Sequence, residues 1–275
     1  MSGSEPATPA PSTLSEAIRA ALLTGPARAK IFAARQVARD WRLGRLVHEF
    51  DAAMPDYPAR PARPELLPPG KMPKRGKGGS QRGQIALWHA LAHIEFVAID
   101  LALDMVGRFG GQMPRGFTDD FMAVAADEAM HFALLERKLA SLGSFYGALP
   151  AHAGLWQSAH ETRHDVAARL AVVPMVLEAR GLDVTPATLE RVRAKGDLTG
   201  AKILQRILDD EIRHVAIGTR HFVAHAQRHG FDPPKRWHIL VKQHFRGVLR
   251  PPFNDSARYA AGLSRDFYGS VAVST

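Results

Sequence analysis

Two stretches decide the fold: VAADEAMHFALL at Val124–Leu135 and ILDDEIRHVAIG at Ile207–Gly218. Each places a glutamate three residues before a histidine, namely Glu128 and His131 in the first, Glu211 and His214 in the second. Residues three apart share one face of an α-helix, and both faces are otherwise apolar. An ionised glutamate on the buried side of a helix is costly unless it is paired or binds a metal. Both stretches therefore predict helices that carry metal ligands into the core.

Two other apolar stretches each hold a single carboxylate, Glu95 within 85–99 and Glu178 within 166–182. Glu95 lies 33 positions before Glu128, and Glu178 lies 33 positions before Glu211. A helix with one Glu followed by a helix with Glu-x-x-His thus occurs twice. This is the ligand set of ferritin-like di-iron and di-manganese bundles. The predicted metal ligands are Glu95, Glu128, His131, Glu178, Glu211 and His214.

Structural roles compete with this interpretation. Any one of these glutamates could be a buried partner of Arg169 or Arg180, and either histidine could be a packed core residue. The matching spacing of all six favours a metal site. Glu161 and His164 have the same three-residue spacing but lie about 21–25 Å from Glu178 along a helix. We expect this third pair to make an ordinary polar contact.

Apolar residues recur at helical intervals, and no segment alternates like a strand. The predicted fold is all-α: a ferritin-like four-helix bundle with extra N-terminal and C-terminal helices. Long helices are expected at about 82–108, 117–142, 152–181 and 197–228, and shorter ones at 186–195 and 234–249. The expected regions are a disordered tail (1–13), N-terminal helices (14–54), a proline-rich basic strap (55–81), the di-metal bundle (82–228), and a C-terminal helix and tail packed on the bundle (229–275).

The chain has 275 residues and a formal net charge of +9, from 36 Lys+Arg against 27 Asp+Glu. Seven of the basic residues lie between positions 58 and 82, beside one acid, Glu65. A solvated strap over the surface is favoured there, because no aromatic residues are interleaved for base stacking. The alternative is that this Arg60–Arg82 strip docks an anionic substrate or RNA.

The absence of cysteine excludes disulfides, iron–sulfur clusters and thiolate zinc sites. Carboxylate and imidazole ligands suit iron or manganese, so two iron ions are the expected cofactor and manganese the alternative. Neither a secretory signal nor an 18-residue run without charge is present, so we expect a cytoplasmic protein without a membrane span.

The sequence resembles the DUF455 family of bacterial ferritin-like proteins. The resemblance covers roughly residues 14–265, and its most specific blocks are Leu91–Asp104, Val124–Leu135, Tyr146–Trp156, Val173–Pro186 and Ile207–Gly218. It implies the same six metal ligands, without a departure from the family pattern. In ligand pattern alone, the chain is also similar to di-iron hydroxylases that modify tRNA.

Five further residues are candidates near the site. Asp127 and Asp210 precede the two motif glutamates, and each could accept a hydrogen bond from a metal-bound imidazole, although this position points off the ligand face. Asp127 could still orient a histidine on a neighbouring helix, and a surface carboxylate is the alternative. Arg180 could hold an anionic substrate or pair with Asp183. His152 could line an entrance, although packing is favoured. Tyr146 would need to lie near the metals for a redox role.

These features favour an O₂-activating di-iron oxidase or hydroxylase on an organic substrate, with RNA as one option. It would need an external electron donor, because the chain has no flavin or iron–sulfur motif. The alternatives are a metal-handling protein, such as a ferroxidase or manganese catalase, and a nucleic-acid-binding bundle with a structural metal site. An oligomer is compatible with either.

Overall fold

The computed structural model describes residues 13–68, 71–73 and 80–269. Within these residues the backbone forms helices, turns and two isolated β-bridges, and no strand. The predicted all-α fold is confirmed. The elements in chain order are α1 Leu14–Leu22, α2 Ala27–Arg42, α3 Gln81–Phe109, η2 Gly110–Gln112, α4 Arg115–Ser141, α5 Gly154–Glu161, α6 Val166–Val172, η3 Val173–Glu178, α7 Ala179–Ala194, α8 Leu198–Arg228, α9 Pro233–His244, α10 Asp255–Ala260 and α11 Arg265–Tyr268.

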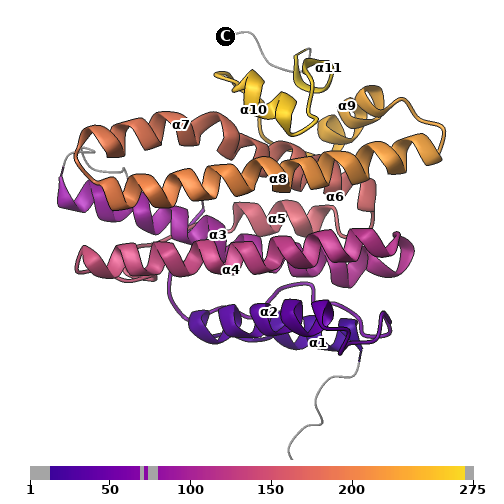
Figure 1. The fold of residues 1–275 in the computed structure, drawn as a ribbon, viewed down its shortest axis with the longest axis horizontal. Coiled ribbons are helices and arrows are strands. Elements are labelled where there is room, and N and C mark those ends of the chain that lie inside the picture. Colours follow the sequence, from indigo (N-terminus) through magenta and orange to yellow (C-terminus); the bar gives the residue numbers. More distant parts are fainter. Residues whose placement is uncertain (1–12, 69–70, 74–79, 270–275) are drawn as a thin grey trace, which may run out of the picture.

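Two long helical hairpins form the centre of the molecule (Figure 1). One hairpin pairs α3 with α4, and the other pairs the run α6–η3–α7 with α8. The hairpins meet where α4 packs against α8, while α1 and α2 cover the outer side of the first hairpin. Buried aromatic side chains such as Phe96 and Phe132 fill the space between α3 and α4.

The third long helix differs from the prediction for residues 152–181. It is interrupted at 162–165, where the Asp165 side chain accepts hydrogen bonds from the backbone N–H groups of Ala167 and Ala168 and starts α6. Residues 186–195 do not form a separate helix either. Helix α7 continues through Pro186 to Ala194, with buried Leu182 and Leu189 on either side of the proline. Tertiary packing therefore outweighs the helix-ending tendency of the proline.

The expected N-terminal helical region, 14–54, is divided at Pro26, and helix does not continue to residue 54. Helix α2 ends at Arg42, and Gly44 takes a positive φ of 67° that turns the chain back. The returning segment runs beside α1, where Leu14 N donates to Val47 O over 2.9 Å. The predicted disordered tail lies outside the described residues, except for Thr13, which caps α1.

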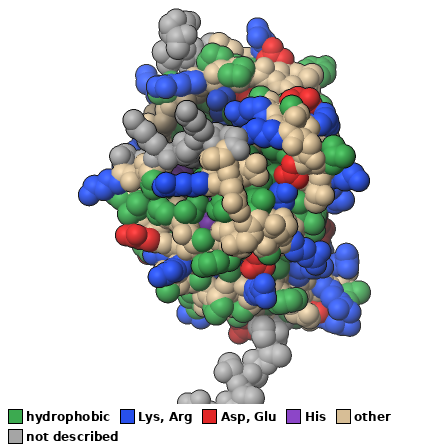
Figure 2. Space-filling view, turned by 90° about the vertical axis from the view of Figure 1, so that its left-hand side faces the viewer, with side chains coloured by type: hydrophobic (Ala, Val, Ile, Leu, Met, Phe, Trp, Pro, Cys, Tyr) green, Lys and Arg blue, Asp and Glu red, His purple; other side chains and the backbone are tan. Residues whose placement is uncertain are grey.

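Residues 55–68 of the strap contain no helix and are attached to the rest of the protein at both ends. Ala59 N donates to Leu22 O over 2.9 Å, and Leu67 N donates to Ala151 O over 2.8 Å. The basic residues at positions 74, 75 and 77 lie outside the described residues. On the face that Figure 2 shows, Lys and Arg side chains lie in several groups with hydrophobic side chains between them.

The C-terminal segment is joined to the bundle by a buried ion pair. The Arg258 guanidinium on α10 donates to both carboxylate oxygens of Asp183 on α7, over 2.8 and 2.7 Å. Helix α9 packs against α6 and α8.

Among the described residues, one segment, Gln81–Gln112, is long and apolar enough to cross a membrane by length and composition alone. Of its most apolar window, 61% is buried inside the protein, as in the core helix of a soluble bundle. This is weak evidence for a membrane span.

Candidate metal centre

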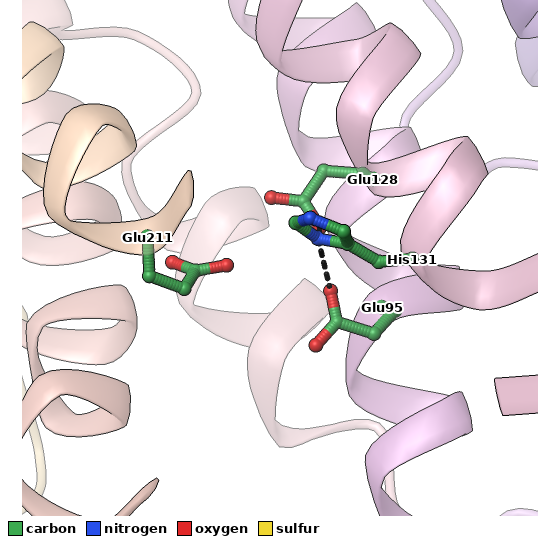
Figure 3. A group of neighbouring side chains, drawn as sticks. All are labelled: Glu95, Glu128, His131 and Glu211. Carbon is green, nitrogen blue, oxygen red and sulfur yellow. Dashed lines mark hydrogen bonds and ion pairs between the residues drawn. The ribbon is translucent and has the colours of Figure 1, made fainter. Parts of the chain in front are cut away.

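The six predicted ligands come from four elements of the bundle. Helix α3 carries Glu95, and α4 carries Glu128 and His131. Glu178 is the last residue of η3, while Glu211 and His214 lie on α8. Figure 3 shows Glu95, Glu128 and His131 on one hairpin, facing Glu211 from the other.

Glu128 lies at the centre of this cluster and contacts both imidazoles. Its Oε2 lies 3.4 Å from His131 Nδ1, and its Oε1 lies 3.0 Å from His214 Nδ1. The same His131 nitrogen is 3.3 Å from Glu95 Oε2, and His214 Nδ1 is 3.6 Å from Glu211 Oε1. One ligand atom from each of Glu95, Glu128, His131 and Glu211 lies within 4.8 Å of the others. Such a cluster could hold a metal ion.

Several of these buried atoms lack a hydrogen-bond partner within the described part of the chain. They are Glu128 Oε1, Glu211 Oε2 and His214 Nδ1. Glu128 Oε1 and His214 Nδ1 are close together, but their geometry is not that of a hydrogen bond. A buried polar atom without a partner is destabilising. All three are lone-pair donors to a cation, so the donor set fits a metal.

Three of the four glutamates of the predicted ligand set have raised pKa values, which favours their neutral form. Burial and the neighbouring Glu128 raise the pKa of Glu95 well above its ordinary value. Burial, together with the Glu211 and Glu128 carboxylates, raises the pKa of Glu178 to about 8. Glu178 is only partly buried and is not one of the four residues whose ligand atoms converge. Burial and Glu128 also raise the pKa of Glu211.

The pKa values of Glu128 and the two histidines shift in the direction that favours their charged forms. Burial opposes ionisation of Glu128, but the nearby His131 and His214 imidazoles outweigh it and lower its pKa. Burial also disfavours a charged His131, yet Glu128 and Glu95 raise its pKa to about 11. Protons on the imidazoles thus balance the buried carboxylates. A cation could replace them, since metal binding to such ligands releases protons.

Each histidine also contacts an aspartate from the opposite hairpin. His131 Nε2 lies 3.0 Å from Asp210 Oδ2, and His214 Nε2 lies 3.3 Å from Asp127 Oδ2. Arginines hold both aspartates, because Asp210 accepts from Arg206 Nε over 2.6 Å and Asp127 is paired with Arg213. With Nε2 donating to a carboxylate, Nδ1 is directed toward the glutamates. This is the usual arrangement around metal-bound histidine.

The backbone changes form immediately before Glu178. Residues Val173–Glu178 form one π-helical segment that begins beside Pro174. π-Helical turns inside α-helices are rare and recur at functional sites. Gly218 on α8 permits the close approach, because a Cβ atom there would come within 2.3 Å of Pro174 Cβ.

The alternative role of the glutamates, as partners of Arg169 or Arg180, can be compared with the ion pairs in the structure. Arg169 donates to Asp104 Oδ2 over 2.7 Å, and Arg180 lies 3.5 Å from Asp183 Oδ2. Neither arginine is paired with one of the four glutamates. Glu161 lies 3.0 Å from Arg246, which is an ordinary polar contact as expected for it.

The remaining candidates lie on the other side of α3 or at the surface. Arg180 is exposed and donates to the carbonyls of Arg250 and Pro252. The backbone carbonyl of His152 is 3.0 Å from His93 Nε2. Tyr146 Oη is 2.9 Å from His93 Nδ1, and its ring packs against Phe132. None of these three residues is a member of the four-residue ligand cluster.

Sequence reasoning missed two features that the structure places near the site. The π-helical segment was not anticipated, and Pro174 was the available signal. The contact of Asp210 with His131 of the opposite hairpin was also missed, although the same role had been considered for Asp127.

The fold and the cluster together define an all-α protein whose bundle core holds a buried Glu/His group that could bind metal. The model of the family described as "Protein of unknown function (DUF455)" matches residues 23–269, so the chain belongs to this family. It is 40% identical over 213 residues to an "Uncharacterized protein" of Haemophilus influenzae, covering 75% of this chain and 74% of that one. No solved structure matches significantly.

Proposed function

We propose that this protein is a non-haem di-iron, or iron–manganese, carboxylate enzyme of the ferritin-like type that oxidises or hydroxylates an organic substrate. The observation that carries the proposal is the convergence of two Glu-x-x-His helices on buried lone pairs without hydrogen-bond partners. Oxygen and imidazole donors of this kind suit iron and manganese.

In this proposal Glu95, Glu128 and His131 hold one ion, and Glu178, Glu211 and His214 hold the other. Glu128 lies between the two imidazoles, so its carboxylate would be available to either ion. Asp127 and Asp210 keep the proton on Nε2 of each histidine, leaving Nδ1 free to bind. When bound, such a metal pair supplies electrons for the reduction of dioxygen.

The proposal has consequences outside the site. The chain's own residues supply no flavin or cluster motif, so the reducing electrons would come from an external donor. A reducing cytoplasm is the location that fits this chemistry. Docking of RNA or another anion at the Arg60–Arg82 strip stays a prediction; the exposed Arg60 donates one hydrogen bond to Pro64 O.

The test is anaerobic reconstitution with Fe(II), followed by metal counting and exposure to air. We expect two irons per chain and a new near-ultraviolet charge-transfer band after exposure. Glu128→Gln and His214→Asn should lose bound iron. His164→Asn is the matched control, because this exposed histidine has the same Glu-x-x-His spacing outside the cluster.

Fewer than one metal per chain, or binding that is equal in the cluster variants and the control, would overturn the metal centre. Rapid disproportionation of hydrogen peroxide by the manganese form would instead favour a catalase. RNA affinity that depends on salt and survives Glu128→Gln would favour the nucleic-acid-binding alternative.

A further inference from the structure

A cavity lies on the side of α3 that faces away from the metal cluster. Its volume is about 380 Å³, within the range of small-molecule sites. Strap residues 57–66 form one wall, and α3, Tyr146 and α5 form the others. Apolar and aromatic side chains predominate, among them Phe96, Val97, Trp156 and three prolines of the strap.

Both carboxylates of this cavity have cationic partners, and its one arginine, Arg60, is exposed to solvent. Asp100 Oδ1 is 2.6 Å from Lys30 Nζ, and both side chains are buried. Glu161 is paired with Arg246 over 3.0 Å, and Arg60 donates to Pro64 O over 3.3 Å. A cation entering the cavity would lose its hydration without gaining an unpaired carboxylate, and an anion would gain only the exposed Arg60, whose solvated charge compensates little of that cost. The cavity therefore fits an uncharged molecule.

The Tyr146 hydroxyl is able to bind such a molecule. His93 Nε2 lies 3.0 Å from the His152 carbonyl, so this nitrogen carries the ring proton. Its Nδ1 then accepts from Tyr146 Oη over 2.9 Å. Burial lowers the pKa of His93 to about 4, which keeps the ring neutral. Tyr146 Oη thus donates inward and keeps its lone pairs for a donor in the cavity.

The cavity is separate from the metal cluster. At 3.6 residues per turn, Phe96, Val97 and Asp100 lie about 100–200° around α3 from Glu95. The thickness of a helix, about 10 Å with its side chains, therefore separates a molecule in the cavity from the cluster. Tyr57 is 65% exposed and stacks on His160, with ring centroids 4.9 Å apart. This pair lines the cavity at its solvent side.

We propose that this cavity is a binding site for a neutral aromatic small molecule with one hydroxyl group, whose ring lies against Phe96 and Trp156 and whose hydroxyl donates to Tyr146. The site is distinct from the metal centre and does not depend on it. The attached strap gives the pocket its fixed outer wall, which is a role for this proline-rich segment beyond covering the surface.

The test is equilibrium dialysis of the full chain against 2-naphthol, with 2-naphthoate as the charged analogue. We expect one saturable site per chain for 2-naphthol and at least tenfold weaker binding of 2-naphthoate. Val97→Trp fills the cavity and should weaken binding at least tenfold. Val184→Trp makes the same exchange at an exposed position of α7 outside the cavity and should leave binding unchanged.

Two further variants keep the test decisive. Ala153→Trp narrows the cavity from an exposed position, so it reports on the site even if Val97→Trp fails to fold. Tyr146→Phe should weaken binding of 2-naphthol but not of naphthalene. Equal affinity of the wild type and both tryptophan cavity variants, equal affinity for the anion, or no saturable binding would overturn the proposal. Glu128→Gln should not change 2-naphthol binding, so failure of the metal centre and failure of this site are separable.

Discussion

Each candidate ligand histidine contacts a carboxylate from the opposite hairpin. Asp210 reaches His131 from α8, and Asp127 reaches His214 from α4. The two contacts fix the ring orientation on both sides of Glu128. They also join the two hairpins, because each contact runs from a residue of one hairpin to a residue of the other.

Replacing these aspartates should weaken metal binding without removing a ligand. Asp210→Asn removes the charge that orients His131, so we expect metal affinity to fall about 10–100-fold. Competition with a coloured chelator would measure the change. Asp209→Asn is the matched control, since Asp209 is the exposed neighbour that bonds Gln205. Equal metal affinity of the two variants would remove the orienting role.

A buried carboxyl outside the metal cluster should make stability depend on pH. Burial raises the pKa of Asp100 to about 7 from 3.8, despite Lys30. The folded state therefore holds a proton that the unfolded state releases as pH rises between these values. Asp100 thus contributes to the free energy of unfolding below pH 4, and this contribution is lost as pH rises to 7, with a slope of at most about 1.4 kcal/mol per pH unit. Denaturant unfolding at several pH values would measure it against the Lys30→Met/Asp100→Leu variant, which should lack this slope.

At the scale of elements, the same ion pair ties α2 to α3. Lys30→Met leaves Asp100 buried without its partner and should lower the free energy of unfolding by about 3–5 kcal/mol. Adding Asp100→Leu should recover most of this loss, because an apolar pair needs no compensation. Urea unfolding of the single and double variants would show it. A double variant that is as unstable as the single variant would contradict this account of the pair.

Stability should also depend on the close contact between α8 and the π-helical segment η3. A Cβ atom at Gly218 would lie 2.3 Å from Pro174, so Gly218→Ala must displace one element. We expect a loss of about 1–3 kcal/mol in the free energy of unfolding, together with weaker metal binding. Gly181→Ala is the control, because no atom lies within 4 Å of its added Cβ. That exchange should be neutral or stabilising by up to about 1 kcal/mol.

For the whole molecule, metal binding should appear as stability. A ligand that binds only the folded state adds about 2.7 kcal/mol at one hundred times its dissociation constant. We therefore expect Mn(II) to raise the melting temperature, and EDTA to reverse the rise. Glu128→Gln should show little of this response. A melting temperature that does not respond to either reagent would contradict a metal centre in the core.

The sequence by itself determined the helical class and the set of candidate ligands. Helical periodicity is local, and a Glu-x-x-His pair must share a face wherever its helix lies. The equal spacing of Glu95–Glu128 and Glu178–Glu211 carried enough information to pair the four helices.

Only the tertiary structure decided what lies between those helices. The approach of α8 to η3, the exchange of Asp127 and Asp210 between hairpins, and the cavity under the strap all depend on contacts distant in sequence. Local propensity cannot predict them, because the energy that stabilises each comes from a partner that only packing brings near. Pro186 is the clearest case: its local tendency is to end a helix, and packing keeps it inside one.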